Sequence, residues 1–257
     1  MHLTVVATSP TRRKADSARG VRDLLRAQIL GTGFPDAQLP SETELMREFQ
    51  VGRNVVRAAL AQLQRQGLVA RIQGAGTFVV VHKNRHSLVA GGIGASISDP
   101  MARLETRVLA ERRGLVGATA AVRLGIPVDE PCLVVESVNL VDGEPLMVNT
   151  SYVPGAERQR ALEAAIAPGH WRGDWYEALV RAGMDVRVRE LVTEAVAADE
   201  LVAGDLDVEI GAPLMFVERR LLLEDGTACE YGFSHCRGDR FAFAYEVDTF
   251  APGTMQR

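Results

Sequence analysis

Three polar side chains near the start of one predicted helix carry the clearest chemistry in the sequence. Arg53, Asn54 and Arg57 stand in the first two turns of a helix that we expect to end at Gly67, a residue suited to the left-handed conformation of a helix terminus. The helical period places them on a face of their own. Arginine can donate two parallel hydrogen bonds to O6 and N7 of guanine, which lysine cannot match. The pattern is therefore typical of a helix whose first turns meet base edges in DNA.

Two predicted helices must hold this face in place. The earlier helix begins at Ser41, which is placed to cap it while Glu44 reaches back from the third helical position, as in a capping box. Val51 and Gly52 make the turn into the later helix. Each helix also has an apolar face with spacings of three and four residues. These faces consist of Leu45, Met46 and Phe49 in one helix and of Val56, Ala59, Leu60 and Leu63 in the other.

Two short strands are predicted directly after these helices, at Leu68–Ile72 and Thr77–Val81. Gly74 and Gly76 lie at the tip between them, where the lack of side chains lets the backbone approach a ligand closely. With an amphipathic first helix at Ser17–Leu30, this order of elements predicts a winged helix-turn-helix. Exposed arginines on short helical hairpins usually only solvate a surface. The ordered set of cap, turn, arginines and wing favours DNA binding instead.

The charge distribution supports a polyanionic partner for the first part of the chain only. Residues 1–86 hold thirteen Lys and Arg and six Asp and Glu, a formal charge of +7, whereas the later residues hold sixteen basic and twenty-seven acidic side chains, a formal charge of −11. The chain has two lysines, Lys14 and Lys83. Schiff-base chemistry, including a pyridoxal phosphate anchor, is therefore excluded from the later part, and we expect no cofactor.

The length of 257 residues suits two domains, and the composition is that of a globular protein. We predict a flexible arm at residues 1–16 and a DNA-binding domain at residues 17–82. The glycine-rich residues 83–98 are expected to be a linker, and residues 99–257 a second domain.

The sequence also indicates where in the cell the protein is expected. No apolar run is long enough to span a bilayer, and the first residues lack the pattern of a signal peptide, so the sequence predicts a cytoplasmic protein. The three cysteines, Cys132, Cys229 and Cys236, have no CxxC spacing. They predict buried thiols, with neither a disulfide framework nor a metal site.

The second domain has the pattern of strands linked by hairpins. Two similar units, Pro131–Pro154 and Pro213–Asp239, each contain a strand, an Asp-Gly turn and a second strand. A strand beginning near Leu104 precedes them. Few helices among hairpin-linked strands predict an α+β fold with an antiparallel sheet, not a doubly wound sheet. The remaining predicted helices are Val116–Leu124, Gly173–Ala182 and Asp199–Leu206, and the remaining predicted strands are Arg187–Ala197 and Phe241–Val247.

The first domain resembles the N-terminal domain of the GntR family of bacterial transcription regulators. The resemblance is carried by LPSETEL followed by VGRNVVRAALAQLQRQGLVARIQGAGTFV. It implies that the helix containing Thr43 approaches the DNA backbone and that Arg53 and Arg57 contact bases or phosphates. It also implies that Gly74 and Gly76 bring the wing to the minor groove.

Three positions depart from the pattern of that family. Gly52 stands where Ser or Thr is usual, Val55 where Thr is common, and Ala75 where a basic residue is frequent at the wing tip. A hydroxyl contact to phosphate is therefore missing at Gly52, while Val55 is a candidate to pack on a thymine methyl. Specificity should then depend on three residues of the recognition helix, Arg53, Asn54 and Arg57.

The second domain resembles the UTRA ligand-sensing domain of the HutC subfamily, which shares its fold with chorismate lyase. The matching stretches occur in order and are LVDGEPLMVNTSYVP, GDWYEALVRAG, AADELVAGDLDVEIGAP, EDGTACEY and CRGDRFAF. The resemblance implies that this domain binds a small-molecule effector and dimerises.

The effector implied by this resemblance is not a phosphosugar. In phosphosugar-sensing members, two arginines and a serine hold a phosphate at the positions of Ser137, Asn139 and Asp174. Ser137 and Asn139 are neutral and cannot make charge-assisted hydrogen bonds to a dianion. The carboxylate of Asp174 would also repel it. We therefore expect a neutral or amine-bearing effector. The other implied pocket residues are Asn149, Glu230 and Cys236, the last a small replacement for a common Tyr that enlarges the site.

These expectations describe a ligand-responsive DNA-binding repressor that acts as a homodimer on a pseudo-palindromic operator. Repression is the default that the resemblance implies. One alternative is a repressor without an effector, in which the second domain is a dimer scaffold and its polar residues face solvent. Another is a chorismate lyase-like enzyme with a DNA-binding appendage. We disfavour the enzyme because His170 and His235 are the only histidines after residue 86 and no catalytic constellation is recognisable.

Overall fold

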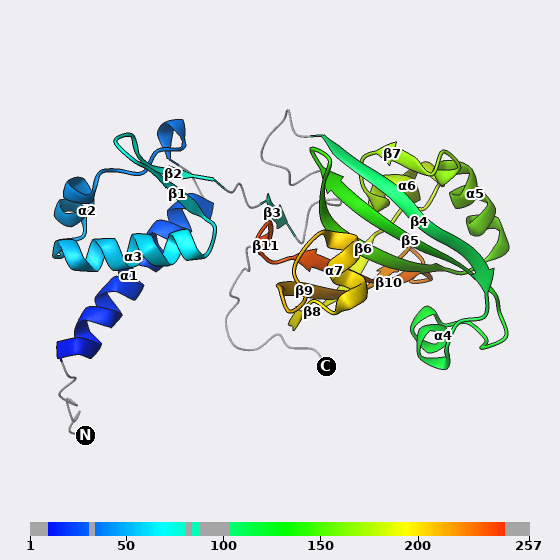
Figure 1. Cartoon of the computed structure of the whole chain (residues 1–257). Coiled ribbons are helices and arrows are strands. Elements are labelled where there is room, and N and C mark those ends of the chain that lie inside the picture. The colour runs from blue at the N-terminus through cyan, green and yellow to red at the C-terminus, as the bar shows by residue number, and fades with distance from the viewer. Residues whose placement is uncertain (1–9, 31–33, 81–83, 88–102, 245–257) are drawn as a thin grey trace, which may run out of the picture. The chain divides into compact units, whose positions relative to one another are not determined.

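The computed structural model describes residues 10–30, 34–80, 84–87 and 103–244 of the chain (Figure 1). They belong to two compact units, one ending at Lys83 and one beginning at Asn84. The N-terminal unit is mainly helical and the C-terminal unit is built on an antiparallel sheet, so the predicted α+β fold is confirmed. None of the described helices is both long enough and apolar enough to cross a membrane.

The N-terminal unit has the predicted order of elements. They are α1 (Pro10–Leu30), the 3-10 helix η1 (Pro35–Ala37), α2 (Glu42–Glu48), α3 (Arg53–Arg65), β1 (Val69–Ile72) and β2 (Gly76–Val79). The strands β1 and β2 pair antiparallel and form the wing. This is a winged helix-turn-helix.

The capping box predicted at the start of α2 is present. The Ser41 hydroxyl accepts a hydrogen bond from the backbone N–H of Glu44 at 3.3 Å, and the Glu44 carboxylate accepts one from the backbone N–H of Ser41 at 2.8 Å. The three helices share one apolar core, whose burial holds α3 with its polar face outward. This core includes Val21, Leu25, Ile29, Leu45, Val56, Ala59, Leu60, Leu63 and Leu68.

Two predicted boundaries are corrected by the structure. The helix α1 begins at Pro10, not Ser17, so residues 10–16 are helical where a flexible arm was predicted. Proline is favoured in the first helical turn, where its missing N–H costs no hydrogen bond. The predicted linker contains a strand, β3 (Asn84–Ser87), which pairs in parallel with β11 (Phe241–Ala244). A strand of four residues whose partner lies far along the chain leaves little local pattern. Residues 1–9 and 88–98 lie outside the described residues.

The C-terminal unit contains a seven-stranded sheet in the order β7-β4-β5-β6-β10-β9-β8, with every neighbouring pair antiparallel. Among the described residues of this unit, four helices interrupt the strands. The elements of this unit not yet given are β4 (Leu104–Gly114), α4 (Ala118–Leu124), β5 (Cys132–Val141), β6 (Glu144–Val153), α5 (Ala156–Ile166), β7 (His170–Arg172), α6 (Trp175–Arg181), β8 (Val188–Ala197), α7 (Glu200–Leu206), β9 (Pro213–Leu222) and β10 (Ala228–Arg237).

The two predicted hairpins are the centre of this sheet. They are β5–β6 and β9–β10, and they pack side by side through the pairing of β6 with β10. Asp142 and Gly143 both have positive φ, at 54° and 82°, as a tight two-residue hairpin turn requires. In this sheet and its helices, sequence reasoning missed α5 and β7, in addition to β3 and to η1 of the N-terminal unit.

Helices cover both faces of the sheet (Figure 1). Leu133 and Val135 of β5 pack with residues of α5 and α6. Val138 of the same strand packs with α7, and Cys132 packs with α4. Because alternate residues of a strand point to opposite faces, α5 and α6 lie on one face and α4 and α7 on the other. The face under α5 and α6 also carries Ser137 and Asn139 of β5, two of the predicted effector residues.

Candidate nucleic-acid interface and effector site

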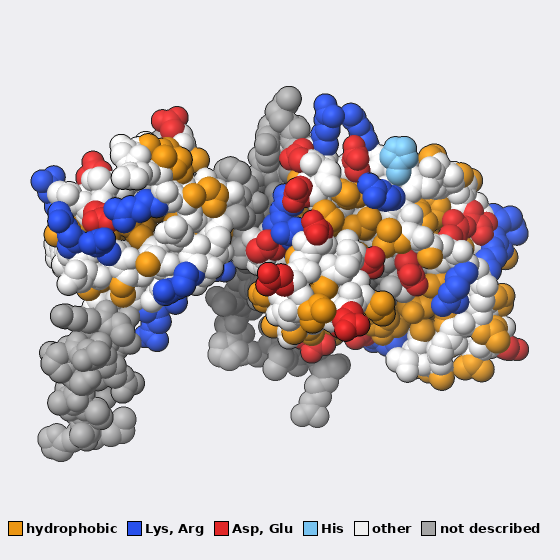
Figure 2. Space-filling model, viewed as in Figure 1, with side chains coloured by type: hydrophobic (Ala, Val, Ile, Leu, Met, Phe, Trp, Pro, Cys, Tyr) orange, Lys and Arg blue, Asp and Glu red, His pale blue; other side chains and the backbone are white. Residues whose placement is uncertain are grey.

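The predicted reading face of α3 lies on the protein surface. Arg53, Asn54 and Arg57 are all exposed in its first two turns, and Thr43 is exposed in the first turn of α2. Figure 2 shows basic side chains gathered over α2 and α3, with acidic ones among them. Val55 differs, because it is half-buried and packs against the core. Only part of its side chain is therefore available to a thymine methyl.

The wing tip is built for close backbone approach. Gly74 and Gly76 are exposed and have φ of 78° and 127°, a region that favours glycine. A Cβ on Gly76 would lie 2.8 Å from the side-chain nitrogen of Gln38. That amide donates a hydrogen bond to the carbonyl of Ala75 at 3.0 Å, so Gln38 braces the tip. The predicted wing glycines are thus required by local geometry.

One carboxylate joins three elements on the α3 side of this unit. Oε1 of Glu42, the first residue of α2, accepts a hydrogen bond from Nη2 of Arg71 on β1 at 3.1 Å. The same oxygen lies 3.8 Å from Nε of Arg57 on α3. Sequence reasoning missed Glu42 and Arg71, because an ion pair between residues 29 positions apart has no local signature.

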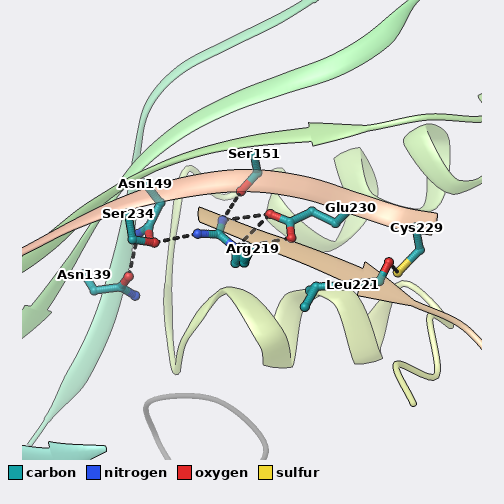
Figure 3. A network of polar contacts seen from close by, with 8 residues as sticks. All are labelled: Asn139, Asn149, Ser151, Arg219, Leu221, Cys229, Glu230 and Ser234. Atoms are coloured by element: carbon teal, nitrogen blue, oxygen red, sulfur yellow. Dashed lines mark hydrogen bonds and ion pairs between the residues drawn. The ribbon is translucent and has the colours of Figure 1, made fainter. Parts of the chain in front are cut away.

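In the C-terminal unit, the predicted effector residues are all buried. Asn149 donates a hydrogen bond to the side-chain carbonyl of Asn139 at 2.7 Å, and Asn139 donates to the hydroxyl of Thr106 at 2.7 Å. Thr106 in turn donates to the carbonyl of Gly173, just before α6, at 2.6 Å. On the other side, the Ser234 hydroxyl donates to Asn149 at 2.6 Å. The chain of bonds crosses β4, β5, β6 and β10 (Figure 3 shows part of it).

A buried ion pair ends this chain of bonds. Arg219 of β9 contacts both carboxylate oxygens of Glu230, at distances from 2.7 to 3.2 Å, and also donates to the hydroxyls of Ser151 and Ser234 (Figure 3). The Glu230 side chain is fully buried, and that of Arg219 is 12% exposed. A buried carboxylate requires such a partner. We call Thr106, Asn139, Asn149, Ser151, Arg219, Glu230 and Ser234 the buried polar network.

Arg219 also was not predicted, although the sequence holds a hint. Gly232 lies opposite Arg219 in the middle of a strand, where glycine is unfavourable without a local reason. A Cβ there would lie 2.6 Å from Glu230 Oε1 and 2.8 Å from Arg219 Nη2. Gly232 therefore makes room for the ion pair.

Three predicted effector residues are not among the members of this network. Ser137 is buried, and its hydroxyl has no hydrogen-bond partner among the described residues. Asp174 is buried at the start of α6, where its carboxylate accepts a hydrogen bond from the backbone N–H of Glu177 at 3.0 Å. Cys236 packs among apolar side chains that include Met147 and Val217. The structure thus connects Asn139, Asn149 and Glu230 and leaves Ser137, Asp174 and Cys236 beside them.

All three cysteines are buried free thiols, as predicted. Burial raises the pKa of the Cys132 thiol to about 11 and that of Cys229 to about 12, and it also raises the pKa of Cys236. These thiols are inert at neutral pH. In the part of the chain that the structure describes, no group of three His, Cys, Asp or Glu side chains is placed to hold a metal ion.

Two families of domains match this chain. Residues 17–79 match the gntR family of bacterial regulatory proteins, and residues 102–242 match the UTRA domain. The chain belongs to the GntR family, with a UTRA domain. It is 28% identical over 237 residues to the transcriptional repressor NagR of Bacillus subtilis, covering 89% of this chain and 93% of NagR. It is 27% identical over 206 residues to the histidine utilization repressor of Pseudomonas putida, covering 78% and 79% of the two chains.

A solved structure matches this chain over most of its length. This GntR regulator matches the crystal structure of PhnF from Mycobacterium smegmatis with a TM-score of 0.64 and 25% sequence identity. The match covers 90% of the present chain and all of the PhnF chain. These relatives are transcription regulators. The GntR protein is therefore a DNA-binding transcription regulator with a ligand-sensing domain and not a chorismate lyase-like enzyme.

Proposed function

We propose that this GntR regulator is a cytoplasmic homodimeric repressor that binds a pseudo-palindromic operator and is released by a small-molecule effector. The observation that carries the DNA-binding part is the exposed cluster of Arg53, Asn54 and Arg57 at the first turns of α3, followed by a glycine-tipped wing. Two recognition helices need two half-sites about one helical turn apart, which favours a dimer acting on a palindrome. The proposed DNA contacts are Thr43, Arg53, Asn54, Val55, Arg57, Gly74 and Gly76.

The names of relatives support repression. NagR of Bacillus subtilis is a repressor, and the Pseudomonas putida relative is a repressor of histidine utilization. A repressor released by a metabolite must bind that metabolite better in the DNA-free arrangement, because a ligand shifts an equilibrium only by its differential affinity. The UTRA domain, residues 99–257 in our proposal, is the part that would do so.

The buried polar network supports an effector that is not a phosphosugar. Arg219 directs its donors to Glu230, Ser151 and Ser234, so a phosphate would have to displace a paired carboxylate to reach that cation. Asp174, the residue that caps the start of α6, adds a second carboxylate to the predicted site. Both features disfavour a dianion, and the Arg219–Glu230 pairing favours a neutral polar effector over an amine. The proposed effector residues remain Ser137, Asn139, Asn149, Asp174, Glu230 and Cys236.

Selection of duplexes from a randomised pool by the full-length protein tests the first half of this proposal, because it should enrich an inverted repeat. Thermal-shift measurements test the second half. We expect neutral metabolites to raise the melting temperature and glucosamine 6-phosphate to leave it unchanged. Stabilisation by glucosamine 6-phosphate alone would contradict the proposed effector class.

The second candidate is a repressor without an effector. It is favoured by the closure of the buried polar network, since its side chains bond to one another and are shielded from solvent. In that case no pool of cell metabolites should release the selected duplex from the protein. Release by any fraction of such a pool would exclude this candidate.

A further inference from the structure

The ion pairs of Glu42 link the recognition helix to the wing. Its side chain is 22% exposed, whereas those of Arg57 and Arg71 are 59% and 57% exposed. The two arginines come from α3 and β1 and, with Thr77 of β2, line the same depression in the surface. One carboxylate therefore restrains two exposed guanidinium groups from different elements.

Stability does not explain this arrangement. Ion pairs with largely exposed partners contribute little to folding. The capping of α2 does not need Glu42 either, because Ser41 and Glu44 form the capping box. A carboxylate beside residues that approach a polyanion also weakens their binding by repulsion. The role of Glu42 must then lie in how it orients the side chains of Arg57 and Arg71.

The contacting atoms indicate which nitrogens of the two arginines remain available to DNA. Arg57 contacts Glu42 through Nε, at 3.8 Å, and this contact does not use the two terminal nitrogens of the guanidinium. Those nitrogens are the ones that can bind O6 and N7 of guanine together. Arg71 contacts the same carboxylate oxygen through Nη2 at 3.1 Å. A phosphate group in DNA of any sequence must compete with Glu42 for either arginine.

We propose that Glu42 is a specificity-determining residue that positions Arg57 and Arg71 for one DNA sequence and penalises their binding to phosphates of any other. This inference rests on the proposed binding of DNA by α3 and the wing. It assigns Arg71 to the DNA-binding surface as well. Preorganised side chains discriminate better because less of the binding free energy is lost in ordering them.

The test compares full-length wild-type protein with the variant Glu42→Gln. The reference duplex is the one that the wild type enriches from a randomised pool, and the second probe is a shuffled duplex of equal length and composition. Fluorescence anisotropy then gives the ratio of the two affinities at several salt concentrations. We expect Glu42→Gln to lower this ratio by about tenfold, mainly through tighter binding of the shuffled duplex.

Glu48→Gln is the matched control. It makes the same change of charge on the same helix, at an exposed residue for which no ion pair is present among the described side chains. It should leave the ratio of affinities nearly unchanged. If Glu48→Gln lowers the ratio as much as Glu42→Gln does, general electrostatics explain the effect and the inference is wrong.

A double-mutant cycle tests whether Glu42 acts through Arg71. In the background of Arg71→Ala, the effect of Glu42→Gln on the ratio should shrink, because one of the two restrained arginines is gone. Glu42→Asp, which keeps the charge and withdraws the carboxylate from both arginines, should also lower the ratio, and it replaces Glu42→Gln if that variant does not fold. If a folded variant of Glu42 has the same ratio of affinities as the wild type, this inference is wrong, while the proposed binding of DNA still stands. Failure of the wild type to enrich any sequence overturns the proposed function and this inference with it.

Discussion

The polar residues of the two units are arranged in opposite ways. Arg53, Asn54 and Arg57 of the N-terminal unit are exposed on a helix, and apolar residues on the other side of the same helix hold them there. In the C-terminal unit, Asn139, Asn149 and the other members of the buried polar network bond to one another inside the protein. The first set is ready for an external partner. The second set makes its bonds within its own domain.

This difference predicts that substitutions in the two sets have different readouts. An exposed arginine that binds DNA can be removed with little effect on folding. A member of a buried, bonded network cannot be removed without leaving its partner unsatisfied in a medium of low polarity. Binding and unfolding measurements on matched variants therefore test the comparison directly.

The largest expected effect is on unfolding. Arg219→Ala leaves the carboxylate of Glu230, which is fully buried, without its cation, and we expect a loss of about 3–5 kcal/mol in the free energy of unfolding of the C-terminal unit. Urea denaturation of the full chain measures it. Arg220→Ala is the control, because the adjacent Arg220 pairs with Glu190, whose side chain is 42% exposed, and should lose only about 0–1 kcal/mol. Equal losses in the two variants would show that the Arg219–Glu230 pair has no special role.

The second effect should appear in binding and not in unfolding. Arg53→Ala removes an exposed guanidinium at the first residue of α3, and we expect the binding of the enriched duplex to weaken by about 1–3 kcal/mol, with relaxed choice at one base. Anisotropy titrations with single-base variants of the duplex measure both. Arg65→Ala, at the last residue of the same helix, is the control. A uniform loss across all duplexes would instead make Arg53 a phosphate contact.

The comparison also explains which parts of the structure were predictable from the sequence. The cap at Ser41, the apolar spacing in α3 and the Asp142–Gly143 turn are local patterns, and all three were predicted correctly. The pairings of Arg219 with Glu230 and of Glu42 with Arg71 join residues on different elements. Such contacts depend on strand register and helix packing, which no local spacing encodes. The short strand β3 was missed for the same reason, since its partner β11 lies near the other end of the chain.

A smaller effect on stability is expected at the start of α2. Ser41→Ala removes the side chain that accepts from the backbone N–H of Glu44, and we expect the N-terminal unit to lose about 1 kcal/mol in its free energy of unfolding. Thermal unfolding followed by circular dichroism measures it. Thr43→Ala, on the same turn but outside the capping box, should have a smaller effect on unfolding and a larger one on DNA binding. The opposite ranking would contradict the assignment of these two neighbouring residues to separate roles.

The smallest effect concerns the pH dependence of that cap. Hydrogen bonds from the side chain and then the backbone of Ser41 lower the pKa of the Glu44 carboxyl. A carboxyl whose pKa is lower in the folded state contributes stability that is fully present above its unfolded value of about 4.3 and is lost as the pH falls through the folded value. The stability difference between wild type and Ser41→Ala should therefore narrow below about pH 4. It should not vanish, because the bond from the Glu44 N–H to the Ser41 hydroxyl does not titrate. A difference that stays constant from neutral to acidic pH would show that the bond from the Ser41 hydroxyl to the Glu44 carboxylate contributes nothing to stability.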